Sequence, residues 1–168
     1  IKSYEEAARI LAKACDLMPN NADVLFNWGS TLLELGHFEK AREKLQHALN
    51  LNPDILEAKL NLGSACYYLH DYTSALRYFQ AALEERPNDV DALNNMGVVL
   101  SVQGKPEAAS ESFKRASSLS PDNANIFLNW GILYSRMGQY PEAIDKFEKA
   151  SELDPGNSNI QMNWADRK

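Results

Sequence analysis

Apolar residues recur at helical spacing along short segments of the chain. Between positions 22 and 35 they form one stripe, at Leu25, Trp28, Leu32 and Leu35. Residues three or four positions apart share one face of an α-helix, so the stripe predicts an amphipathic helix. A second stripe follows, which the Asn-Pro pair at 52–53 ends: Ala41, Leu45, Ala48 and Leu49. The pattern therefore predicts two consecutive helices, each with one buried face.

This two-helix pattern returns at a fixed interval. Each first helix contains an Asn-x-Gly element, and its glycine recurs every 34 residues, at Gly29, Gly63, Gly97 and Gly131. The second helices repeat an alanine, a large apolar residue and a closing proline: Ala41, Ala75, Ala109 and Ala143; Leu45, Phe79, Phe113 and Phe147; Pro53, Pro87, Pro121 and Pro155. A constant period of this size predicts an array of stacked repeats. The small residues leave room for two helices to approach closely, and the large ones fill the space beside them.

The period divides the chain into four complete repeats and two partial ones. The complete repeats are predicted to span 22–55, 56–89, 90–123 and 124–157. Residues 1–21 match the second helix of a repeat, and residues 158–168 match the beginning of a further first helix. A repeat buries its apolar faces only against its neighbours. We therefore expect both ends to expose apolar surface, either for end-to-end packing between copies or because the chain belongs to a longer array.

Glycine also predicts where the first helices end. Gly36, Gly104 and Gly138 lie just beyond three of these helices. Glycine is common at this place because it adopts the left-handed backbone conformation that closes many helices. The second repeat has His70 there, so it is expected to turn without glycine.

Together these residues resemble the tetratricopeptide repeat, or TPR. The second repeat matches the family pattern at Leu62-Gly63, Tyr72, Ala75, Phe79, Ala82 and Pro87. The resemblance implies an all-α fold, a right-handed superhelix (α-solenoid) of antiparallel helix pairs whose first helices line a concave groove. It also assigns the aromatic positions Tyr72 and Tyr140 to the core. The sequence departs from the pattern at His70 and at Pro106, which stands at an aromatic position.

Composition and charge narrow the range of partners. The 168 residues include 23 acidic and 17 basic side chains, for a net charge of −6. An acidic chain is poorly suited to nucleic acid or anionic membranes, and no apolar segment approaches the length of a membrane span. Cys15 and Cys66 lie among apolar residues, which predicts packed, reduced thiols and favours a cytoplasmic location. Because Ile1 already lies in an amphipathic segment, the chain resembles a piece of a longer protein whose targeting signals would be missing.

No pattern in the sequence indicates catalysis or a cofactor. The three histidines, His37, His47 and His70, lack the spacing of a helical metal site. No glycine-rich phosphate loop and no nucleophile motif is present. We therefore expect no metal, no cofactor and no enzyme activity in this segment, while a catalytic domain fused outside it is compatible with the sequence.

The resemblance places a ligand against the side of each first helix that faces away from its partner helix. At about 100° per residue, the side opposite the apolar stripe carries a recurring set of polar and aromatic residues. The candidate peptide-binding residues are Asp23, Phe26, Asn27, Glu57, Leu60, Asn61, Tyr67, Tyr68, Asp91, Asn94, Asn95, Leu128, Asn129 and Arg136. Their acidic and apolar groups suggest a polypeptide with basic and apolar side chains. Acids also favour the first turn of any helix, so the charge pattern has a purely local explanation too.

One asparagine recurs on this face in each complete repeat, at Asn27, Asn61, Asn95 and Asn129, and Asn163 extends the series. An amide side chain donates and accepts hydrogen bonds as a peptide unit does, so such a ladder can hold an extended polypeptide by its backbone. In this respect the array resembles the TPR superhelix of O-GlcNAc transferases. Alternatively, each asparagine bonds the backbone of the adjoining repeat and only fixes the superhelix.

The sequence therefore favours a non-catalytic protein-interaction scaffold that binds an extended or helical polypeptide in a concave groove. Two alternatives stay open. In one, the array recruits substrates for a larger enzyme, such as an O-GlcNAc-type glycosyltransferase. In the other, it is a self-assembling module that associates through its incomplete terminal repeats.

Overall fold

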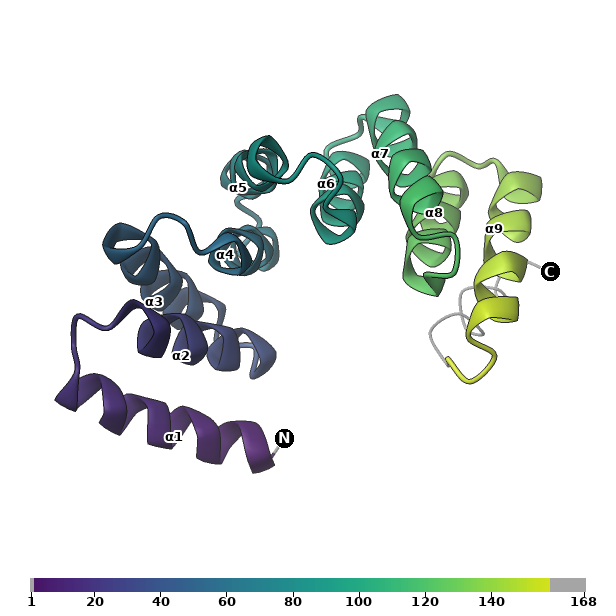
Figure 1. The fold of residues 1–168 in the computed structure, drawn as a ribbon. Coiled ribbons are helices and arrows are strands. Elements are labelled where there is room, and N and C mark those ends of the chain that lie inside the picture. The colour runs from purple at the N-terminus through teal and green to yellow at the C-terminus, as the bar shows by residue number, and fades with distance from the viewer. Residues whose placement is uncertain (1, 158–168) are drawn as a thin grey trace. The chain divides into compact units, whose positions relative to one another are not determined.

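The computed structural model describes residues 2–157 of the chain. Over this range the backbone forms nine α-helices and no β-strand (Figure 1). The helices are α1 (Lys2–Leu17), α2 (Ala22–Glu34), α3 (Phe38–Leu51), α4 (Leu56–Tyr68), α5 (Tyr72–Glu85), α6 (Val90–Val102), α7 (Pro106–Leu119), α8 (Ala124–Arg136) and α9 (Tyr140–Leu153). The expected all-α fold is confirmed.

Helices pack within two compact units, unit 1 (residues 1–87) and unit 2 (residues 88–168). Unit 1 contains α1 to α5, and the described part of unit 2 contains α6 to α9. Four hairpins are formed by the pairs α2–α3, α4–α5, α6–α7 and α8–α9. Within each unit the hairpins stack, α3 on α4 and α7 on α8, and the first helices also meet, α2 with α4 and α6 with α8. This stacking of hairpins is the arrangement of an α-solenoid.

Each hairpin is closed by contact between a glycine and a large side chain. A Cβ atom on Gly63 would lie 2.7 Å from Cε1 of Phe79, and one on Gly131 would lie 2.5 Å from Cε1 of Phe147. Carbon atoms in favourable contact are about 3.5–4.0 Å apart, so no larger residue fits without a shift of the ring. Phe79 and Phe147 are themselves fully buried. The close approach expected at the glycines is confirmed.

The first helices end in the same turn in all four hairpins. Gly36, Gly104 and Gly138 have φ values of 75°, 70° and 74°, and His70 adopts the same left-handed conformation with a φ of 61°. The backbone N–H of the following residue closes the turn by donating to a carbonyl five residues earlier, for example Asp71 to Cys66 at 2.9 Å. His70 therefore makes the glycine turn without glycine, and its Nδ1 lies 2.9 Å from the Tyr72 hydroxyl.

Side-chain caps begin several helices. Asn21, Asp89 and Asn123 each accept a hydrogen bond from a backbone N–H in the first turn of α2, α6 and α8. Asp71 caps α5 by accepting from the N–H of Ser74, and hydrogen bonds from Ser74 lower the pKa of the Asp71 carboxyl. Helix starts are thus specified by residues that the repeat pattern does not require.

Two aromatic predictions are wrong, and a third, the assignment of Tyr72 to the core, holds only in part because its side chain is half-buried. Trp28 is only half-buried, because the side of α2 that faces α3 runs through Leu25, Gly29 and Leu32. Trp28 is turned to one flank, where the Lys44 ammonium lies 4.7 Å from the centre of its ring. The TPR pattern assigns Tyr140 to the core, yet it is the first residue of α9 and is 50% exposed at the end of the hairpin.

Helix α1 packs on α2, and several large apolar side chains are exposed on α1 and directly after it: Tyr4, Ile10, Leu17 and Met18. Exposed apolar surface in this part of the chain agrees with the prediction for residues 1–21. The matching prediction for residues 158–168, including Asn163, lies outside the described residues. None of the described helices has the length and apolar character that crossing a membrane requires.

Candidate functional site

With the exception of Leu128, the candidate residues lie on the sides of α2 and α4 in unit 1 and of α6 and α8 in unit 2 that face away from the second helix of the same hairpin. We call these sides the first-helix faces. The exposed members are Asp23, Asn27, Glu57, Tyr68, Asp91 and Arg136. The half-buried members are Phe26, Leu60, Asn61, Tyr67, Asn94, Asn95 and Asn129. Each face therefore presents amide side chains among charged and apolar groups.

Leu128 differs from the other candidates because it belongs to the core. Its side chain is 8% exposed and packs in a cluster with Ala143, Phe147 and Ala150 of α9. The second helix of its own hairpin thus covers it. Leu128 offers little surface to a ligand.

In unit 1 the two asparagines differ in their hydrogen bonds. Asn61 on α4 donates from Nδ2 to Oγ of Ser30 on α2 at 2.8 Å, and Ser30 donates to the carbonyl oxygen of Phe26 at 2.9 Å. The amide of Asn27 forms no side-chain hydrogen bond within residues 2–157. Asn61 therefore keeps its carbonyl oxygen as an acceptor, and Asn27 keeps both its donor and its acceptor.

The same division occurs in unit 2. Asn129 on α8 donates from Nδ2 to Oδ1 of Asn94 on α6 at 3.1 Å. The Asn95 amide has no hydrogen-bond partner among the described residues. In both units the bridging amide reaches a side chain on the preceding first helix rather than the backbone of the adjoining repeat.

The acidic candidates all lie in the first turns of their helices. Glu57 forms an ion pair with Arg86 at 3.5 Å, and both side chains are more than half exposed. Asp23 and Asp91 make no ion pair in the part of the chain that the structure describes. Among the acidic candidates, the unpaired carboxylates are therefore Asp23 in unit 1 and Asp91 in unit 2.

A pocket of about 420 Å³ lies between α2 and α4 in unit 1; we call it the aromatic pocket. Its lining consists of Leu33, Glu34, Gly36, Phe38, Asn61, Ser64 and Tyr68. The rings of Phe38 and Tyr68 stack with their centroids 4.5 Å apart and their planes 12° from parallel. The volume falls within the range of roughly 300–1,000 Å³ that is usual for ligand pockets.

Sequence reasoning identifies Asn61 and Tyr68 as site residues but misses Phe38. Phe38 stands at an aromatic position that the TPR pattern assigns to packing, which gives it no part in binding. Its ring nevertheless meets Tyr68 of the next repeat. In the sequence, the signal for an aromatic site is the Tyr67-Tyr68 pair. In the structure the Tyr67 ring belongs to the same aromatic cluster, with its centre 5.4 Å from that of Tyr68.

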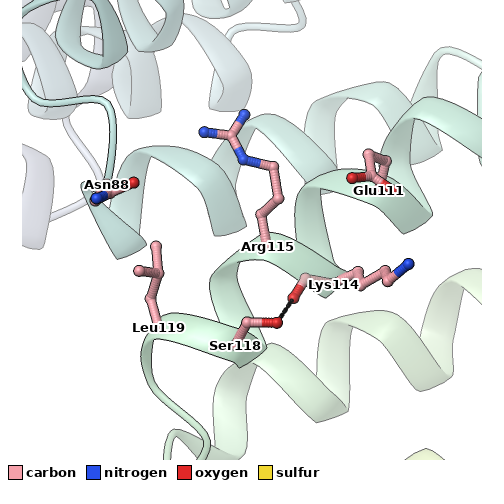
Figure 2. A pocket seen from close by; sticks show the side chains of 6 residues that line it. All are labelled: Asn88, Glu111, Lys114, Arg115, Ser118 and Leu119. Carbon is pink, nitrogen blue, oxygen red and sulfur yellow. Dashed lines mark hydrogen bonds between the residues drawn. The ribbon is translucent and has the colours of Figure 1, made fainter.

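A second pocket of about 250 Å³ lies along α7 in unit 2 (Figure 2). It is lined by Asn88, Glu111, Lys114, Arg115, Ser118 and Leu119, none of which is a candidate residue. Figure 2 shows Lys114 and Arg115 extending in different directions from the helix. The Ser118 hydroxyl donates to the Lys114 carbonyl oxygen at 2.8 Å. With charges of both signs on one helix surface, this pocket shows no convergent set of groups for one ligand.

The cysteines and histidines do not form a reactive centre in residues 2–157. No three metal-ligating side chains in this range come together to hold a metal ion. Cys15 and Cys66 are free thiols, and burial raises the pKa of the Cys66 thiol. Cys66 is therefore protonated and poorly nucleophilic at neutral pH.

Two family models of the tetratricopeptide repeat match the chain, one over residues 26–90 and the other over residues 90–156. The chain belongs to the tetratricopeptide repeat family. The two matches adjoin each other and include every candidate residue except Asp23. No significant match is found among curated proteins.

Solved structures agree with this assignment. A thermophilic TPR protein from Thermus thermophilus has a TM-score of 0.86 at 23% identity, covering 98% of this chain and 90% of its own. MamA from Desulfovibrio magneticus RS-1 has a TM-score of 0.79 at 24% identity, covering 92% and 88%. YrrB, described as a TPR protein with an unusual peptide-binding site, has a TM-score of 0.74 at 23% identity, covering 96% and 83%. The chain is thus an all-α TPR solenoid, the fold of a protein-interaction scaffold.

Proposed function

We propose that this TPR chain is a non-catalytic scaffold that binds an extended polypeptide on its first-helix faces. Asparagine side chains hold the backbone of the bound polypeptide, and the neighbouring side chains select among sequences. The observation that carries the proposal is the set of unused amide groups on these faces. Asn27 and Asn95 present complete amides, while Asn61 and Asn129 present their carbonyl oxygens.

The energetics of asparagine support a role in binding. Asparagine in a helix is about 0.5 kcal/mol less favourable than alanine. At Asn61 and Asn129 a hydrogen bond to the preceding first helix offsets that cost. No such bond offsets it at Asn27 or Asn95 within the described residues. A ligand whose peptide groups bond these amides supplies the missing partner.

The solved structure of YrrB supports the proposal at the level of the fold. YrrB is described as having a peptide-binding site, although its identity to this chain is only 23%. A solenoid of the same kind therefore accommodates a peptide. In the present chain the unused amides of the first-helix faces are the groups suited to that role.

The experiment begins with peptides selected on this chain from a display library of random linear sequences. The affinity of a selected peptide is then measured by fluorescence anisotropy for two double variants, Asn27→Ala/Asn61→Ala and Asn95→Ala/Asn129→Ala. Each lost amide contact is expected to cost about 1 kcal/mol, so at least one double variant should bind roughly tenfold more weakly or worse.

The matched control is Asn50→Ala, which removes an exposed helical asparagine on α3, away from the first-helix faces. Circular dichroism confirms that each variant keeps its helix content. Unchanged affinity in both double variants would overturn the proposal.

A further inference from the structure

We infer that the aromatic pocket of unit 1 is a subsite for an arginine side chain of the bound polypeptide. The inference rests on the proposed function, because the arginine belongs to the polypeptide bound there. It adds which side chain of that polypeptide is selected and which pocket selects it. Three features of the pocket support it: the stacked rings, the hydrogen-bond acceptors and the charge.

The stacked rings provide a flat wall for a planar cation. Phe38 and Tyr68 lie nearly parallel, and Tyr68 is 52% exposed, so part of this stack is accessible to a ligand. A guanidinium group stacks favourably on an aromatic ring when it lies within about 6 Å of the ring centre. Leu33 offers further apolar lining for the methylene groups of the side chain.

The polar groups of the pocket are left chiefly as acceptors. Ser30 uses one of the two N–H donors of Asn61, and the hydroxyl of Ser64 donates to the carbonyl oxygen of Leu60 at 3.0 Å. Beside the second N–H of Asn61, what remains toward a ligand is the Asn61 carbonyl oxygen, a lone pair of Ser64 and the carboxylate of Glu34. Arginine matches such a set because its guanidinium has five N–H donors and no acceptor.

The charge of the pocket also favours a cation. No lysine or arginine belongs to its lining, and Glu34 forms no ion pair within residues 2–157. An acidic ligand would be repelled by Glu34, and an apolar one would leave the acceptors without donors. A lysine ammonium satisfies the charge, but it lacks the planar surface that stacks on the rings.

The corresponding place in unit 2 has a different chemistry. Two repeats further along the chain, the equivalents of Glu34, Phe38, Ser64 and Tyr68 are Val102, Pro106, Ile132 and Arg136. That place has no aromatic wall and no acid, and it carries a cation of its own. The arginine subsite is therefore specific to unit 1, and unit 2 is an internal control.

The test uses a single-residue probe, Nα-acetyl-arginine N-methylamide, titrated into the whole chain and followed by NMR. The comparison probe is the citrulline analogue, which has the same shape without the charge. The arginine probe should shift the Asn61 side-chain amide and the Gly36 backbone amide in a saturable way. Citrulline should bind at least twofold more weakly.

Two variants test the named contacts. Glu34→Gln should weaken binding of the arginine probe about two- to fivefold, as expected for an exposed ion pair. Tyr68→Leu keeps an apolar wall without the ring and should weaken binding by a similar factor. Glu148→Gln is the matched control for the charge change, because this exposed carboxylate lies on the second helix α9 of unit 2. It should leave the affinity unchanged. Thermal melts verify that all three variants are folded.

Equal binding of the arginine and citrulline probes, shifts located away from the pocket, or full affinity in Glu34→Gln would each overturn the inference. These outcomes are distinguishable from failure of the proposed function. If asparagine variants weaken a selected peptide but the arginine probe does not bind the pocket, only the inference fails. If the probe binds as described but no peptide depends on the asparagines, the subsite stands and the backbone-binding proposal fails.

Discussion

In unit 1 the face between α2 and α4 carries the stacked rings of Phe38 and Tyr68 beside Glu34. The same positions in unit 2 hold Pro106, Arg136 and Val102. The backbone around these residues is nevertheless the same in both units, with helix ends closed by left-handed residues and glycines in contact with buried large side chains.

The difference separates two classes of residue within one repeat. Residues that touch the partner helix of their own hairpin recur, because a change there disturbs close packing. Apart from the recurring asparagines, residues on the first-helix faces have no such partner and differ between units. The framework is therefore duplicated, while the chemistry presented to a ligand is particular to each unit.

The largest expected effect tests the shared framework. Phe79→Ala in unit 1 and Phe147→Ala in unit 2 should each lower the free energy of unfolding by about 3–5 kcal/mol, because each removes a buried ring from its contact with a glycine. Denaturant unfolding measures both losses. The neighbouring exposed residues provide controls, and Gln80→Ala and Glu148→Ala should change stability by less than about 0.5 kcal/mol. A loss confined to one unit would show that the two hairpins are not held in the same way.

A smaller effect tests the division among the asparagines. Asn61→Ala removes the bond to Ser30, worth about 1 kcal/mol, and regains about 0.5 kcal/mol of helix propensity. Asn27→Ala loses no bond and should be neutral or more stable by about 0.5 kcal/mol. Asn129→Ala and Asn95→Ala should repeat this difference in unit 2. Thermal unfolding measures the four variants. If Asn27→Ala destabilises the protein more than Asn61→Ala, or Asn95→Ala more than Asn129→Ala, that asparagine is a structural residue.

The smallest expected effect concerns the turn that differs between the units. His70 has a φ of 61°, whereas both turns of unit 2 use glycine. His70→Gly should raise the free energy of unfolding by about 0.5 kcal/mol, because relief of the left-handed strain exceeds the entropy that glycine adds to the unfolded chain. Gly138→Ala should have the opposite sign. A destabilised His70→Gly protein in thermal melts would show that the contact with Tyr72 outweighs the strain.

The repeat architecture could be predicted from the sequence because its determinants are local or periodic. Apolar spacing predicts each helix, and the 34-residue recurrence of glycine, alanine and proline predicts their pairing into hairpins. The one first helix that ends without glycine could be located too, because His70 stands 34 residues after Gly36 and 34 before Gly104. The asparagines are placed on the first helices for the same reason, by their fixed distance from Gly29 and its equivalents.

Only the tertiary structure decided which side chains meet across repeats. Helical periodicity specifies a direction to within a residue or so, which is too coarse to separate Trp28 from Gly29 or to recognise that α9 covers Leu128. The Asn61–Ser30 bond and the Phe38–Tyr68 stack join residues about 30 positions apart, and their formation depends on how one hairpin stacks on the next. The sequence determined the hairpins because their contacts recur every 34 residues. The stacking of hairpins decided the site because the partners of its contacts differ from one repeat to another.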